Sequence, residues 1–164
     1  FKMKRKEDIR GTLMKAGFVI VIVVYLAMLC MRGYAKDVPI EKIKEAVENA
    51  GIPEGVQELK DRDLRRYYGI DGSQNKEYFF YKADSSMNVD EVLVIKARNS
   101  EEVSSYEAAV QTHLENQKKS FEGYGVTQTA LLKKAYAQAE GSYVIYMAGE
   151  NADKWKSASE KAVK

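Results

Sequence analysis

An uncharged apolar run near the amino terminus constrains this chain more than any other feature. Sixteen residues, from Ala16 to Met31, carry no charge and lie between Lys15 and Arg32. As a helix they span about 24 Å at ~1.5 Å per residue, which is short of a hydrocarbon core about 30 Å thick. Both flanking basic side chains can extend toward the membrane interfaces, which lengthens the apolar span. We therefore expect residues 15–32 to form a single transmembrane anchor or uncleaved signal.

The charge distribution orients this expected helix. Residues 1–35 carry a net charge of +5 and the other 129 residues carry −3, and six basic residues precede the apolar run. Because basic flanks stay in the cytoplasm, we expect a basic cytoplasmic segment at 1–14, a linker at 33–37 and an extracytoplasmic domain at 38–164. The mildly acidic body also argues against nucleic-acid binding, which needs a clustered basic face.

Two other fates of the apolar run stay open. Gly33 and Ala35 place small residues where a signal peptidase requires them, so cleavage after Ala35 would release a secreted domain. Lipidation of Cys30, the only cysteine, is disfavoured because Leu29 stands directly before it, where the processing enzyme needs a small residue. All three fates place the domain outside the cytoplasm.

The body alternates between helical and strand-like patterns. Amphipathic helices are expected over 40–50 and over 100–121, the second capped by Ser100, with shorter helices near 61–68, 127–132 and 151–162. Strand-like segments cover 77–83 and 89–97, and 135–148 reads as a hairpin. Four consecutive apolar residues, Val92 to Ile95, predict an inner strand. We expect an α+β domain in which helices pack on one face of an antiparallel sheet of about four strands.

Few residues of the body fit known catalytic or metal-binding patterns. It has no cysteine, one histidine and no glycine-rich phosphate-binding motif, so we expect no catalytic residue, no metal site and no cofactor. The histidine, His113, is expected to be a structural residue on the inward or flanking side of its helix. Neighbouring acids such as Asp61 and Asp63, or Glu101 and Glu102, fit helix starts better than acid–base catalysis.

Tyrosine is abundant, with 11 residues in the chain. Tyr67 with Tyr68, and Tyr78 with Tyr81, could form an aromatic surface that recognises sugar or peptide. The alternative is that the rings pack against the sheet and only the hydroxyl groups reach water.

Several segments read together resemble a family of extracytoplasmic proteins of unknown function from Gram-positive anaerobic bacteria. The segments are, in order, KDVPIEKIKEAV, YYGID, DEVLVIKARNSEEV, QKKSFEGYG and GSYVIYMAG, and the resemblance covers residues 36–155. It implies an envelope location. Because such proteins are often encoded near membrane-bound O-acyltransferases, it also implies an accessory role in modifying surface polysaccharide. The family offers no established active site, and its motifs match this chain at Tyr68, Gly69, Glu91, Lys96, Gln117, Tyr124 and Gly141.

The candidate binding residues combine these matches with the tyrosine pair. Glu91 and Lys96 are five residues apart in one strand, so they should point to opposite faces of the sheet and cannot share a site there. An ion pair at the rim of the sheet is expected for one of them. The candidates are Tyr67, Tyr68, Glu91, Lys96, Gln117 and Tyr124.

We expect a membrane-tethered extracytoplasmic binding or accessory module of the bacterial cell envelope, without catalytic activity. Its partner would be an envelope protein or a surface polysaccharide. The alternative is an envelope enzyme, either a carboxylate-dependent glycan hydrolase or an acyl-transfer subunit. An enzyme needs a cleft where titratable groups converge, whereas a binding module needs an exposed patch of tyrosine or aliphatic side chains.

Overall fold

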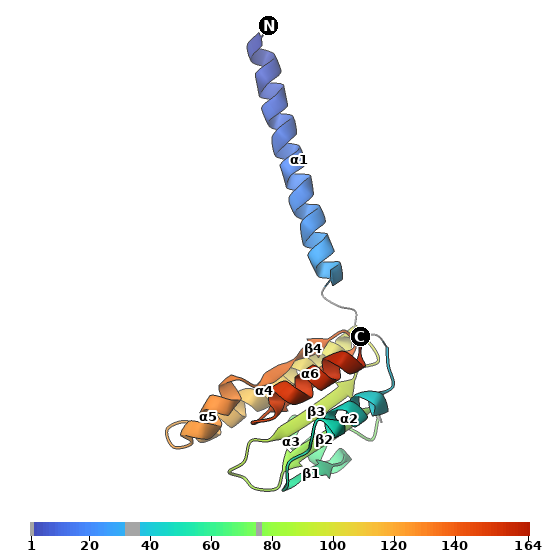
Figure 1. The fold of residues 1–164 in the computed structure, drawn as a ribbon, viewed down its shortest axis with the longest axis vertical. Coiled ribbons are helices and arrows are strands. Elements are labelled where there is room, and N and C mark those ends of the chain that lie inside the picture. Colours follow the sequence, from blue (N-terminus) through green and yellow to red (C-terminus); the bar gives the residue numbers. More distant parts are fainter. Residues whose placement is uncertain (1, 32–36, 75–76) are drawn as a thin grey trace. The chain divides into compact units, whose positions relative to one another are not determined.

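The computed structural model describes residues 2–31, 37–74 and 77–164 (Figure 1). The chain divides into two compact units, Phe1–Tyr34 and Ala35–Lys164. The first contains one helix, α1 (Lys2–Met31), in which the side chains of residues 13–27 are described. Every large hydrophobic side chain between Leu13 and Leu26 is exposed. Within the described part of the chain, no helix combines the length and the hydropathy needed to cross a bilayer.

The expectations for Cys30, for cleavage after Ala35 and for most of the linker concern positions outside the residues whose side chains are described.

The second unit is an α+β domain built on one antiparallel sheet. Its strands are β1 (Val56–Leu59), β2 (Tyr78–Ala83), β3 (Glu91–Lys96), β4 (Tyr136–Glu140) and β5 (Tyr143–Ala148), in the spatial order β1-β2-β3-β5-β4. Its helices are α2 (Ile40–Asn49), α3 (Asp61–Tyr68), α4 (Ser100–Phe121), α5 (Val126–Lys133) and α6 (Ala152–Ala162). All four neighbouring strand pairs are antiparallel. The predicted fold class is therefore confirmed, with five strands in place of about four.

The strand that the sequence did not reveal is β1. Its four residues, VQEL, are partly buried at the two ends and exposed in the middle, so they lack the apolar alternation of a half-buried strand. The segment becomes a strand because it pairs with β2, from Val56 opposite Ala83 to Leu59 opposite Phe80. Long-range pairing of this kind overrides weak local propensity.

Helices cover both faces of the sheet, so the prediction of helices on one face was wrong. Helices α3, α4 and α5 pack on the face that carries Phe80, Leu93, Ile95, Val144 and Tyr146. Helices α2 and α6 lie side by side on the other face, over Phe79, Val92, Val94, Ile145 and Met147. The physical reason is visible in β5, because all six of its residues are buried. A strand without an exposed side must have cover on both faces.

Local predictions around the centre of the sheet hold. Strand β3 is an inner strand between β2 and β5, and β4 with β5 forms the expected hairpin. The cap of α4 differs by one position, because the side chain of Asn99 accepts a hydrogen bond from the Glu102 amide at 2.8 Å. Asn99 has extended backbone angles, as an N-cap residue requires, whereas Ser100 is already the first helical residue.

Long-range hydrogen bonds that involve side chains join separate elements of the domain. The fully buried indole of Trp155 on α6 donates to the Gly51 carbonyl at 2.9 Å, just after α2. At the outer edge of β4, the Ala139 amide donates to Glu107 of α4 at 2.9 Å. Gln111 of the same helix donates to the Ala137 carbonyl. These side chains of α4 therefore occupy backbone groups that a further strand would need.

Candidate functional site

Two of the buried polar side chains of the domain, Glu91 and His113, are in contact, and other polar groups bind the same carboxylate. This side chain is 1% exposed. The Tyr68 hydroxyl donates to Oε1 of Glu91 at 2.5 Å, and Lys82 Nζ donates to Oε2 at 2.6 Å. His113 Nε2 lies 3.1 Å from the same carboxylate. We call Tyr68, Lys82, Glu91 and His113 the Glu91 cluster.

Four separate elements position the cluster. Lys82 on β2 lies directly opposite Glu91 on β3 in the strand register, so the two side chains share one face. Tyr68 is the last residue of α3, which ends there because Gly69 adopts a left-handed conformation with φ 69°. His113 is buried on the inner side of α4. The cluster thus joins α3 and α4 to the central strands of the sheet.

The electrostatics keep the Glu91 carboxylate ionised. Burial alone would raise the pKa of Glu91, but the hydrogen bonds and charges of His113 and Lys82 outweigh it and hold that pKa below its ordinary value. Burial, followed by the Glu91 charge, raises the pKa of Tyr68 well above its ordinary value, so the phenol remains a donor. Because a carboxylate only accepts hydrogen bonds, the network assigns the proton on Nε2 of His113 to face Glu91.

Tyr146 on β5 lies beside the cluster and differs from its members in one respect. Its hydroxyl is the single buried side-chain nitrogen or oxygen without a hydrogen-bond partner in the described chain. The ring centroid of Tyr146 is 5.2 Å from that of His113 and 6.0 Å from that of Tyr68. A polar atom in this state raises the free energy of the folded form.

The structure brings together three of the six candidate binding residues. Tyr68 and Glu91 belong to the cluster, and the Tyr67 ring covers Lys82, whose Nζ is 5.1 Å from the ring centroid. The other three lie elsewhere. Lys96 points to the opposite face from Glu91, as the strand spacing predicted, and pairs with Asp37 and Glu77.

Gln117 and Tyr124 are the remaining candidates outside the cluster. Gln117 is partly buried on α4, one helical turn after His113. Tyr124 follows α4 and is 65% exposed, with its ring centroid 5.9 Å from that of Phe121. Of the six candidates, Tyr124 is thus the most accessible aromatic side chain for a partner.

Sequence reasoning missed two residues of the cluster, Lys82 and His113, as members of a shared site. The prediction that His113 is structural agrees with its burial, but the sequence does not identify Glu91 as the residue that His113 contacts. The pairing register of β2 and β3 would have identified Lys82. A buried acid such as Glu91 requires a cation nearby, and Lys82 is the basic residue directly opposite it. That register depends on contacts that sequence periodicity does not encode.

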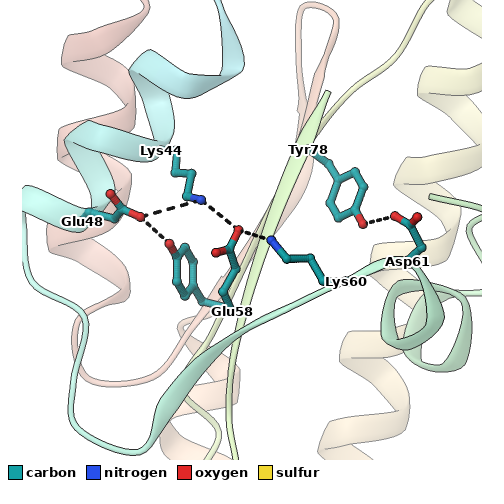
Figure 2. Close-up of polar contacts among 7 residues, drawn as sticks. Lys44, Glu48, Glu58, Lys60, Asp61 and Tyr78 are labelled. Atoms are coloured by element: carbon teal, nitrogen blue, oxygen red, sulfur yellow. Dashed lines mark hydrogen bonds and ion pairs between the residues drawn. The ribbon is translucent and has the colours of Figure 1, made fainter. Parts of the chain in front are cut away.

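A second polar network at the surface joins α2, β1 and β2, and a separate pair joins β2 to α3 on the other face of the sheet (Figure 2). Glu58 accepts hydrogen bonds from Lys44 and Lys60, each at 2.8 Å. The Tyr78 hydroxyl donates to Asp61, and the Tyr81 hydroxyl donates to Glu48. The two tyrosines therefore pack by their rings and use their hydroxyls on neighbouring carboxylates, which fits the structural alternative for this pair.

Surface hollows occur away from the cluster. One of about 620 Å³ lies between α2 and α6 and includes Ala46, Ala50 and Ala158 in its lining. Another of about 540 Å³ includes Lys96 and Arg98. Neither contains a residue of the Glu91 cluster. Among the described residues, no three histidine, cysteine or acidic side chains come close enough to hold a metal ion.

Comparison with known proteins gives a family and no assigned activity. No curated protein and no solved structure matches this chain. Residues 48–149 match the family described as a domain of unknown function, DUF4358. The matched span contains all five strands of the sheet and the complete Glu91 cluster. Since it covers more than half of the sequence, the chain belongs to the DUF4358 family of domains of unknown function.

Proposed function

We propose that this chain is a membrane-tethered, extracytoplasmic binding or accessory module of a bacterial cell envelope. The observation that carries the proposal is the uninterrupted exposure of the large hydrophobic side chains of α1 between Leu13 and Leu26. A contiguous apolar surface of this kind is unfavourable in water and marks a membrane or protein contact. The proposed anchor covers residues 15–32, with the amino terminus in the cytoplasm and residues 38–164 outside.

The surrounding sequence supports a membrane as the contact. Basic residues dominate the segment before the apolar run, which matches the bias of cytoplasmic flanks. The proposed anchor ends at residue 32, five residues after Ala27, the last residue of α1 whose side chain is described. Release by cleavage after Ala35 remains the alternative localisation.

Charge within the apolar run should abolish membrane retention. Each aspartate in the centre of a membrane helix is unfavourable by roughly 2.5–3.5 kcal/mol, so Val21→Asp with Val24→Asp is expected to move the chain into the soluble fraction. The wild-type chain should stay with membranes in alkaline carbonate and leave them in detergent. Fractionation with an immunoblot measures both.

The matched control for this test is Met87→Asp with Val126→Asp, which places the same two charges on exposed hydrophobic residues of the domain. It should remain in the membrane fraction. Extraction of the wild-type chain by carbonate, or recovery of a product that starts at Lys36, would contradict the anchor.

The burial of Glu91 and His113 favours a binding function over a catalytic one. Both carboxylate oxygens of Glu91 are engaged by side chains of the same domain, and neither Glu91 nor His113 is accessible to a substrate. The enzyme alternative draws on the same pair, because a carboxylate 3.1 Å from an imidazole is a combination used in acid–base catalysis. Such groups must meet substrate in a cleft, and these two are buried and in contact with Tyr68 of α3.

One co-sedimentation experiment separates the two functions. The full-length chain in detergent is mixed with purified surface polysaccharide of its host, and both the pelleted protein and the polymer are analysed over time. Retention without change in polymer length or acyl content is the expected result. Tyr124→Ala should weaken retention about 2- to 10-fold because an exposed aromatic contact is lost.

Lys154→Ala, at an exposed position on α6, is the control and should bind as the wild type does. Shortening or deacylation of the polymer by the wild-type chain would establish the enzyme alternative. Failure to retain the polymer would remove polysaccharide as the partner.

A further inference from the structure

The unpartnered hydroxyl of Tyr146 lies among residues that already share one carboxylate. Tyr146 is opposite Leu93 in the β3–β5 register, and Glu91 is two residues from Leu93 on the same strand. Tyr146 and Glu91 are therefore diagonal neighbours on one face, a separation of about 7–8 Å that a tyrosine side chain can bridge. The Tyr68 ring lies between α3 and this pair, 6.0 Å from the Tyr146 ring.

The Tyr146 phenol is suited to donate rather than accept. Burial, and next the charge of Glu91, raise the pKa of Tyr146 well above its ordinary value, so the hydroxyl keeps its proton. In the described conformation Oε1 of Glu91 accepts from Tyr68 and Oε2 accepts from Lys82. Tyr146 is a neighbouring donor that has no acceptor while Tyr68 holds its place.

The element that carries Tyr68, helix α3, is short and has no side-chain cap. Helix α3 has eight residues and no side-chain hydrogen bond at its N-cap, Lys60. Gly69, in the left-handed conformation, directly follows Tyr68 and allows the backbone to change direction there. A helix of this length is not stable alone. It is attached to the sheet by the apolar contacts of Leu64, Tyr67 and Tyr68 and by the hydrogen bond from Tyr78 to Asp61.

We propose that Tyr146 is a reserve hydrogen-bond donor for Glu91, and that α3 is a cover that lifts from the Glu91 cluster while Tyr146 takes the place of Tyr68. In the closed state Tyr68 donates and the Tyr146 hydroxyl is unpartnered. In the open state Tyr146 donates, so the carboxylate keeps its number of donors. The exchange lowers the free energy of opening and presents the Glu91–His113 pair to the surroundings.

The proposal predicts that the effect of Tyr146→Phe changes sign with the residue at position 68. With Tyr68 present, removal of an unpartnered hydroxyl should leave the unfolding equilibrium constant unchanged or lower it. In the Tyr68→Phe background, Tyr146 is the donor to Glu91, and its removal should raise that constant about 5- to 10-fold. Urea denaturation of the full-length chain in detergent measures all four proteins, and both substitutions preserve ring shape.

The control is Tyr81→Phe, which removes a hydroxyl bound to Glu48 on the opposite face of the sheet. Its effect should add to that of Tyr146→Phe without interaction. An effect of Tyr146→Phe with the same sign and size in both Tyr68 backgrounds would overturn the reserve-donor role.

Native-state hydrogen exchange tests the cover independently. The amides of α3 should exchange faster than those of β3 in the wild-type chain, because α3 opens without global unfolding. Tyr146→Phe should slow exchange in α3 by about 10-fold, because the open state then lacks a donor for Glu91. Equal protection of α3 and β3 in the wild type would overturn the cover.

Discussion

Replacement of Glu91 by leucine is expected to destabilise the domain by about 3–5 kcal/mol. The leucine removes the carboxylate that binds Tyr68, Lys82 and His113, and it leaves three polar groups in a buried site without their shared acceptor. Such a loss is a large fraction of the stability of a typical domain, about 5–15 kcal/mol. The free energy of unfolding from urea denaturation is the measurement.

Two comparisons identify the buried charge as the cause. Glu58→Leu removes a carboxylate that also binds two lysines, but on the surface, and should change stability by less than about 1 kcal/mol. Adding Lys82→Met to Glu91→Leu should recover part of the deficit, because removal of both charges is less unfavourable than removal of one. A deficit in Glu91→Leu no larger than that of Glu58→Leu would contradict this account.

The deficit of Glu91→Leu should also depend on pH. Because the folded state lowers the pKa of Glu91 from its ordinary value of 4.5, the carboxylate contributes its full stability above about pH 4.5. That contribution is lost as the pH falls through the folded-state pKa. The difference between the wild type and Glu91→Leu should therefore narrow as the solution is acidified below about pH 4.5.

Trp155→Ala is expected to destabilise the domain by about 3–5 kcal/mol through the core on the other face of the sheet. The indole is fully buried among Ile43, Val47 and Val94, and its N–H satisfies the Gly51 carbonyl at 2.9 Å. The substitution therefore creates a cavity and leaves a backbone acceptor without its donor. Thermal and urea unfolding measure the loss.

The same substitution should loosen α6 and α2 together, because the indole bridges them. Hydrogen exchange should increase in both helices and remain low in α4, which packs on the opposite face. Lys154→Ala, on the exposed side of α6, is the control and should lie within about 0.5 kcal/mol of the wild type. Unchanged exchange in α2 would show that Trp155 does not join the two helices.

The parts of the fold that the sequence predicts are those specified by neighbouring residues. The run Val92 to Ile95 identifies an inner strand, and the turn at Gly141 identifies the hairpin of β4 and β5. The long amphipathic pattern locates α4 to within one residue of its cap. Each of these signals lies within a short window of sequence, where periodicity and turn chemistry are sufficient.

The parts that the sequence does not predict depend on distant contacts. Strand β1 exists through its pairing with β2, and the second helical layer follows from the burial of every residue of β5. The same holds for the Glu91 cluster, whose members are separated by up to 45 positions from Tyr68 to His113. Motif matches point to Tyr68 and Glu91, but only strand register and helix packing bring Lys82 and His113 to them.

The hydrogen bonds from α4 to the outer edge of β4 affect whether neighbouring copies of the domain can aggregate. Edge strands with free backbone groups can join sheet to sheet between molecules and so start aggregation. Here Glu107 and Gln111 of α4 bind the outward backbone groups of Ala139 and Ala137. The proposed membrane anchor would raise the rate at which neighbouring domains meet. The hydrogen bonds on this edge would then oppose strand pairing between those domains. Among the residues that the structure describes, the other edge of the sheet is β1, which is four residues long and has Gln57 and Glu58 in its middle.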